Sequence, residues 1–138
     1  MIIAVIDGMG GGLGSQIVSY LREELPSYID IYALGTNSIA TSAMMKAHAN
    51  KGATGENAIV VSSKKVNIIV SPISVIIPNS MMGEVTCKIS EAVSDSEAYK
   101  IFLPIMPENI EIVGIENKPV ILLIKDAIKL IKKEFNIK

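Results

Sequence analysis

Along the first third of the chain, short runs of consecutive apolar residues alternate with segments whose apolar residues recur every three or four positions, as on one face of a helix. Ile2 to Ile6 form a continuous apolar run, which is typical of a strand covered on both faces within a parallel sheet. The next segment has one apolar helical face, at Leu13, Ile17, Val18, Leu21 and Leu25. Ile29 to Leu34 predict a second strand. The apolar spacing from Ile39 to Ala47 predicts a second helix, with Asn37 or Ser38 as its cap.

The middle of the chain is less regular. Gly52 to Asn57 predict a second glycine-punctuated turn, and Ala58 to Lys65 fit either a short helix or a strand. Val66 to Ser71 predict a further strand because they are rich in β-branched residues. Pro72 to Pro78, an apolar piece bracketed by prolines, fits a loop, an edge strand or an interface. Thr86 or a neighbour is expected to cap the helix that follows.

Two apolar segments near the C-terminus, Lys100 to Ile105 and Ile110 to Ile115, predict strands. About four residues separate them, whereas a parallel crossover needs a dozen or more, so we expect an antiparallel hairpin. Pro119 is then expected in the first turn of a C-terminal helix with one apolar face. Together these elements predict an α/β fold: a single three-layer, Rossmann-like domain over residues 1–138, whose mostly parallel sheet of about five strands includes the hairpin.

Composition limits the number of domains and the class of partner. A chain of 138 residues, 49% of them hydrophobic, can bury one sizeable core but is too short for two ordinary domains. Its 13 basic and 14 acidic side chains leave no excess of positive charge to hold a nucleic-acid backbone. Aromatic residues make up only 4%, so few side chains are available to stack on bases. We therefore expect no nucleic-acid partner.

Cysteine, histidine and hydropathy usage bear on the compartment and on metals. The lone Cys87 excludes an internal disulfide, and no targeting segment precedes the first strand. The longest apolar stretch, Val66 to Pro78, falls short of the ~20 residues that a membrane helix needs. His48 is the only histidine, and no cluster of ligands accompanies it. We expect a cytoplasmic protein with no membrane span and no metal.

The most informative motif lies between the first strand and the first helix, where five of the ten glycines fall within seven residues. A glycine-rich turn lets backbone N–H groups approach a ligand, and the partial positive charge of the helix N-terminus points at the same place. This arrangement suits a phosphate group, such as that of a nucleotide. The candidate binding residues are Gly8, Met9, Gly10, Gly11, Gly12, Leu13 and Gly14.

The spacing Gly8-x-x-x-Gly12-Leu13-Gly14 resembles the glycine turn of short-chain dehydrogenases and, more broadly, the dinucleotide-binding fingerprint. The resemblance implies NAD(P) or another nucleotide as ligand. It also implies a tight turn at Gly8, room for the pyrophosphate at Gly12 and close helix–strand packing at Gly14.

Two departures argue against a dehydrogenase. No acidic residue follows the second strand, where Leu34-Gly35-Thr36-Asn37 stands, and no tyrosine has a lysine four positions later. The motif therefore predicts phosphate binding without dehydrogenation, and no residue is assigned a catalytic role.

Two other polar turns are candidate walls of the same crevice, because ligands of open α/β sheets bind outside the carboxyl ends of the strands. Thr36 and Asn37 offer groups for a ribose or an adenine edge. A second group follows the second helix: Thr54, Gly55, Glu56 and Asn57. The alternative for that group is an ordinary helix-entry loop with Thr54 as its cap. Asn79 and Ser80 either reach the ligand or form a turn.

Three functions remain open from the residues alone. The first is a nucleotide- or dinucleotide-binding module that senses or carries its ligand. The second is a small oxidoreductase or transferase whose chemistry resides in a bound cofactor, with Asp7 or Glu56 as contributing groups. The third is an oligomeric scaffold built on Val75 to Met82 and the C-terminal helix, so a homo-oligomer is a possible partner arrangement.

Over nearly its full length the chain resembles a family of small bacterial proteins defined as a domain of unknown function. The following residues account for the resemblance: Ile6-Asp7-Gly8-x-Gly10-Gly11-Gly12, Ala33 to Asn37, Gly52 to Asn57, Pro72-Ile73 and Asn79-Ser80-Met81. The resemblance implies a bacterial cytoplasmic protein, and it brings no activity, ligand or catalytic residue with it.

Overall fold

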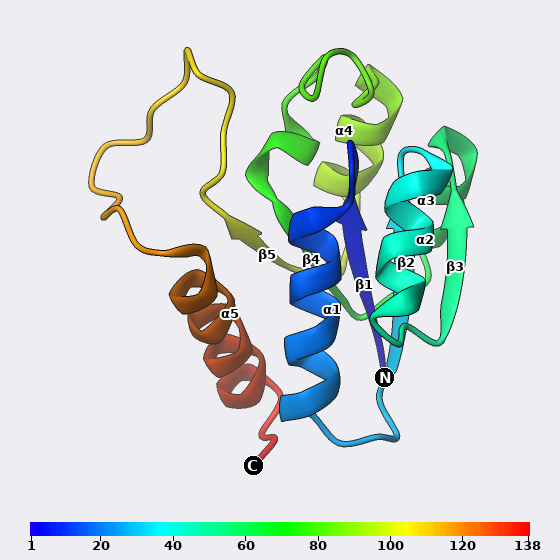
Figure 1. The fold of residues 1–138 in the computed structure, drawn as a ribbon, viewed down its shortest axis with the longest axis vertical. Coiled ribbons are helices and arrows are strands. Elements are labelled where there is room, and N and C mark those ends of the chain that lie inside the picture. The colour runs from blue at the N-terminus through cyan, green and yellow to red at the C-terminus, as the bar shows by residue number, and fades with distance from the viewer.

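A five-stranded parallel sheet forms the centre of the computed structural model, which describes residues 1–138 (Figure 1). The strand order is β3-β2-β1-β4-β5. The strands are β1 (Ile2–Asp7), β2 (Asp30–Gly35), β3 (Lys51–Thr54), β4 (Ile68–Pro72) and β5 (Tyr99–Leu103). Ile3 pairs with Ile31 on one side and with Ile68 on the other, so β1 is the central strand. Ile3 to Ile6 of its apolar run are fully buried because both faces of the sheet are covered, and Ile2 at the start of the strand is partly buried.

Helices cover both faces of this sheet, which gives three layers (Figure 1). One face packs against α1 (Gly12–Glu24), α2 (Ser38–Lys46) and α5 (Val120–Glu134). The other packs against α3 (Glu56–Ser62), α4 (Cys87–Asp95) and the short 3-10 helix η1 (Ile73–Ile76). The prediction of a three-layer, Rossmann-like α/β fold with about five strands is therefore confirmed. No helix is both long and apolar enough to cross a membrane.

Two predicted helix caps are confirmed by the hydrogen bonds they make. The Asn37 side chain accepts a hydrogen bond from the backbone N–H of Ala40 at the start of α2. The Thr86 hydroxyl accepts one from the backbone N–H of Ile89 at the start of α4. Pro119, expected in the first turn of the last helix, is instead the N-cap residue directly before α5.

The predicted antiparallel hairpin is wrong. Lys100 to Ile105 largely coincides with β5, which pairs in parallel with β4, but Ile110 to Ile115 forms no strand. Pro104 and Pro107 interrupt the connection and supply no N–H for strand pairing, and Gly114 has φ 87°, which breaks an extended run. Residues 104–119 form a long loop instead, so every strand of the sheet is parallel.

Three uncertain segments of the middle region are now resolved. The turn predicted over Gly52 to Asn57 is wrong in its first half, which pairs with β2 as the edge strand β3. Ala58 to Lys65, which fitted a helix or a strand, contains most of α3 and no strand. Pro72 to Pro78 contains η1, whose Val75 is fully buried, so this residue is core rather than interface.

Candidate functional site

A cavity of about 490 Å³ lies at the carboxyl ends of β1 and β4, within the size range of small-molecule sites. These neighbouring strands send the chain in opposite directions: β1 leads to α1 on one face, and β4 leads to η1 and α4 on the other. This is the topological switch point at which open α/β sheets bind ligands.

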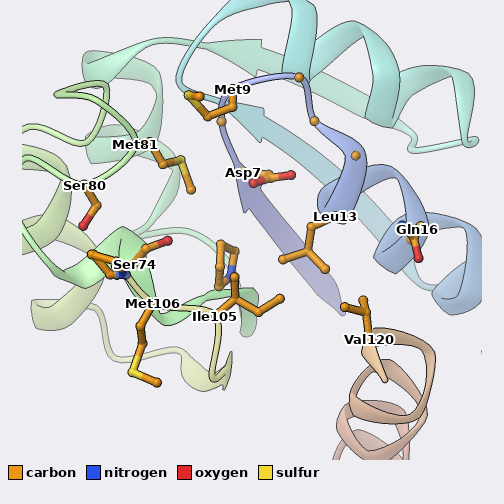
Figure 2. Close-up of a pocket in the computed structure, with 16 residues that line it drawn as sticks. Asp7, Met9, Leu13, Gln16, Ser74, Ser80, Met81, Ile105, Met106 and Val120 are labelled. Carbon is orange, nitrogen blue, oxygen red and sulfur yellow. The ribbon is translucent and has the colours of Figure 1, made fainter. Parts of the chain in front are cut away.

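Three parts of the chain line the cavity (Figure 2). The first is the end of β1 with the glycine loop and the start of α1: Asp7, Gly8, Met9, Gly10, Gly11, Gly12, Leu13 and Gln16. The second follows β4: Pro72, Ser74, Ser80 and Met81. The third comprises the segment after β5 and the first residue of α5: Ile105, Met106, Pro107 and Val120.

The glycine loop, Gly8 to Leu13, lines this cavity and contains backbone N–H groups that have no partner within the chain. The Gly11 N–H donates to the Gly8 carbonyl oxygen at 2.9 Å, and Gly11 has φ 73° as the N-cap of α1. The N–H groups of Gly10, Gly12 and Leu13 make no hydrogen bond within the chain. The last two belong to the first turn of α1, where N–H groups have no partner inside the helix. The loop can therefore donate several hydrogen bonds to an anion.

The glycines of the loop differ in whether the fold itself requires them. A Cβ at Gly14 would lie 2.6 Å from Met44 Sδ and 2.7 Å from Asp7 Cβ, so close packing of α1 on β1 excludes any side chain there. A Cβ at Gly10 or Gly12 would meet nothing within 4 Å, and neither residue has the positive φ that favours glycine. Nothing in the fold therefore requires glycine at Gly10 or Gly12, where the cavity begins.

Asp7 ends β1 at the base of the cavity and is only 5% exposed. Its Oδ2 accepts a hydrogen bond from the Gly14 N–H at 2.7 Å. Burial raises the pKa of Asp7 above its ordinary value; hydrogen bonds from the Gly14 and Gly8 N–H groups act in the opposite direction, and the charge of Glu84 adds to the rise. Asp7 thus anchors the first turn of α1 and places a buried carboxyl beside the ligand space.

Ser74 is the second buried polar group of the cavity. Its side chain is 7% exposed, and its hydroxyl makes no hydrogen bond within the chain. Figure 2 shows the Ser74 side chain on the cavity wall that follows β4. No buried side-chain oxygen or nitrogen of the chain lacks a hydrogen-bond partner, so the unpaired Ser74 hydroxyl oxygen itself reaches the cavity surface, where a ligand or water can bond to it.

Glu84 joins the glycine loop to the end of β2. Its Oε1 accepts hydrogen bonds from the Met9 N–H at 2.9 Å, the Thr36 hydroxyl at 2.6 Å and the Asn37 side-chain amide at 2.8 Å. Desolvation acts to raise the pKa of Glu84, but the hydrogen bonds from Thr36, Met9 and Asn37 outweigh it and lower the pKa below its ordinary value. Glu84 therefore acts as a charged tie between the loop and β2.

The structure brings only part of the predicted site together. Residues Gly8 to Leu13 line the cavity, whereas Gly14 does not line it and packs closely against Asp7 and Met44. Thr36 and Asn37 stand next to the loop, yet they bond to Glu84 and do not line the cavity.

The second predicted group lies outside the cavity. Thr54 bonds to Thr41 at 2.7 Å and does not cap α3, whose N-cap is Gly55. The Gly55 N–H donates to the Gly35 carbonyl oxygen, and Glu56 accepts from the Thr86 hydroxyl at 2.6 Å. Asn57 is exposed on α3. The expectation that this group forms a second wall gains no support from the structure.

Sequence reasoning did not find Glu84, Ser74 or the apolar wall. The hydrogen-bond partners of Glu84 are 47, 48 and 75 positions away in the sequence, so no local spacing indicates these hydrogen bonds. Ile105 and Val120 line the same cavity only because the irregular loop of residues 104–119 returns the chain to that place. The one available indication was the polar turn at Asn79 and Ser80, of which Ser80 does line the cavity.

The cavity can hold an anion at one end and an apolar group at the other, but it contains no recognisable acid–base pair. Nowhere in the chain do three or more His, Cys, Asp or Glu side chains gather as metal ligands.

Comparison with known proteins places the chain in a family. No curated protein matches it. Among solved structures, one similar chain is the dodecameric FMN-dependent Ubix-like decarboxylase from Escherichia coli O157:H7. The two share 11% identity with a TM-score of 0.44, over 98% of this chain and 93% of that one. The model of the family described as a domain of unknown function (DUF3842) matches residues 2–136. The chain therefore belongs to the DUF3842 family.

Proposed function

We propose that the chain binds a nucleotide or dinucleotide, whose phosphate group lies at the loop from Gly8 to Leu13, and that it serves to sense or carry this ligand. The observation that best supports this function is the pair Gly10 and Gly12. Both line the cavity, neither is required by the packing or the backbone conformation, and their N–H groups have no partner in the chain. A ligand that approaches the backbone explains why side chains are absent there.

Two features of the surroundings support the same function. The cavity lies at the switch point of a doubly wound sheet, where nucleotide phosphates sit at the N-terminus of the first helix. On the wall that follows β4, the mostly buried Ser74 offers the cavity a hydroxyl that has no partner within the chain.

The test is ligand-dependent stability. Native mass spectrometry first identifies any nucleotide that copurifies, and thermal denaturation is then followed with a panel of nucleotides. A ligand at about 100 times its Kd stabilises the fold by about 2.7 kcal/mol. We expect Gly12→Asp to abolish this stabilisation because a carboxylate then occupies the phosphate position. The control is Ser19→Ala, on the exposed face of α1.

The result that would contradict the proposal is equally specific. If no nucleotide copurifies or raises the melting temperature, or if Gly12→Asp and Ser19→Ala respond alike to every nucleotide, the loop is a structural turn only.

A further inference from the structure

The two sides of the glycine loop differ in the polar groups they leave free. In a doubly wound sheet a dinucleotide lies across the switch point, with one nucleotide on each side of the first strand. In this chain one nucleotide would lie over β1 and β2, and the other over β1 and β4. Whether both places are open decides the class of ligand.

The β2 side is already filled. The Thr36 hydroxyl and the Asn37 amide, the groups that would meet a ribose there, both donate to Glu84. Asn37 Nδ2 also donates to the Met9 carbonyl oxygen at 2.9 Å. The segment before Glu84 lies against the loop as well, because a Cβ at Gly8 would be 2.6 Å from Met81 Sδ. A sugar on this side would have to displace the segment and compete with a carboxylate for its donors.

The β4 side is open and largely apolar. The cavity extends from the loop to Ile105, which follows β5, and to Val120 at the start of α5. Figure 2 shows Leu13, Ile105 and Val120 facing the same space from three different elements. The unpaired Ser74 hydroxyl lies on this side too. Such a mixture of apolar walls and one free polar group is typical of a site for a ring system.

On the basis of the proposed phosphate site, we infer that the ligand is a phosphomonoester of mononucleotide type, with one phosphate at the glycine loop and one ring against Leu13, Ile105 and Val120. A dinucleotide that spans both sides of β1 is excluded by the Glu84 tie. The Ser74 hydroxyl bonds to the ligand on the β4 side.

Calorimetric titration with five probes tests this inference: inorganic phosphate, AMP, adenosine, FMN and NAD⁺. We expect AMP or FMN to bind at least tenfold more tightly than inorganic phosphate and at least tenfold more tightly than NAD⁺. Adenosine should bind more weakly than AMP because it has no phosphate.

Variants on the β4 side locate the ring. Val120→Asn should weaken binding of the better mononucleotide at least fivefold and leave binding of inorganic phosphate unchanged. Its matched control is Ile121→Asn, because the neighbouring Ile121 side chain is 45% exposed and does not line the cavity. Ser74→Ala should also weaken the mononucleotide without lowering the melting temperature, since its hydroxyl has no partner to lose.

The outcomes separate this inference from the proposed function. If NAD⁺ binds within tenfold of the better mononucleotide, or if Val120→Asn binds like the wild type, the inference is overturned while phosphate binding at the loop stands. If no probe binds in a way that Gly12→Asp abolishes, the proposed function fails, and the inference fails with it.

Discussion

The charge of Asp7 is less favourable in the folded chain than in the unfolded one, because burial raises the pKa of this carboxyl. The protonated form therefore favours folding. The stability it contributes is fully present below the unfolded-state pKa of about 3.8 and is lost as the pH rises through the higher folded-state pKa. Above the folded-state pKa the fold has to accommodate a buried carboxylate beside its cavity.

Replacing this carboxyl by an amide tests the electrostatic cost. We expect Asp7→Asn to raise the free energy of unfolding at pH 7 by about 1 kcal/mol, because the amide oxygen still accepts from the Gly14 N–H and no charge is buried. The advantage over the wild type should shrink as the pH falls toward 3.8. Urea denaturation at several pH values measures it, and an advantage that grows on acidification would contradict the assignment.

Replacing Gly12 and Gly14 by alanine should change the stability of the fold in opposite directions. Gly12→Ala places a methyl group in open space at the first position of α1, so we expect the ligand-free chain to gain about 0.5–1 kcal/mol of stability. Gly14→Ala forces a Cβ against Met44 and Asp7 and should cost about 1–3 kcal/mol. Thermal denaturation without ligand measures both; equal effects would show that the two positions are equally crowded.

At the scale of elements, the connection between η1 and α4 is held to β2 through Glu84. This connection has an unfavourable backbone, because Asn79, Met81 and Met82 all have positive φ. Hydrogen bonds from Met9, Thr36 and Asn37 to one carboxylate oxygen help to hold it in place.

Removing this carboxylate should loosen the connection. We expect Glu84→Ala to lower the free energy of unfolding at pH 7 by about 1–2 kcal/mol, because three donors lose their acceptor. Since the pKa of Glu84 is lowered in the fold, its contribution is present above the ordinary value of 4.5 and is lost as the pH falls through the folded-state pKa. The deficit should therefore shrink in acid; a deficit independent of pH would point to packing alone.

The elements that sequence reasoning predicted are those defined by local pattern. The run Ile2 to Ile6 consists of consecutive apolar residues, and the apolar face that begins at Leu13 recurs from one helical turn to the next. Asn37 caps α2 through the N–H of Ala40, only three residues further on. The hairpin was wrong because Ile110 to Ile115 follows a proline-interrupted connection and contains Gly114, whose positive φ breaks an extended run. Apolar composition does not ensure a strand when no partner edge is reached.

The candidate site divides in the same way. The glycine loop follows from its spacing in the sequence, since Gly8 to Leu13 are consecutive and line one cavity. Glu84, Ser74 and Val120 come to the site through long-range packing, for which a single sequence gives no periodicity. The expectation that Glu56 lies at the binding site gains no support, because its side chain accepts a hydrogen bond from Thr86 and does not line the cavity.

At the scale of the whole molecule, the loop of residues 104–119 projects beyond the β5 edge of the sheet before it returns to the last helix (Figure 1). Val113 is fully exposed within it, and Ile112 and Ile115 are more than a third exposed. The loop has no helix or strand of its own, whereas α5 packs into the core through Ile124, Ala127, Ile128 and Ile131.

This contrast predicts where a protease acts. We expect the Glu-specific protease Glu-C to cut first after Glu108, Glu111 or Glu116, which are exposed in the loop, and to spare Glu23 and Glu24 within α1. The two fragments should stay associated in gel filtration because α5 remains packed on the sheet. Mass spectrometry of the early fragments checks the sites, and early cuts within α1 would contradict the prediction.

The cavity wall contains Leu13 near the beginning of the chain and Val120 near its end. A molecule held between them bridges the first helix and the last, in addition to the direct packing of α1 against α5. Release of the ligand and detachment of α5 then belong to one coupled equilibrium, so the backbone amides of α5 should exchange with deuterium more slowly as the ligand concentration rises, although most of them never touch it.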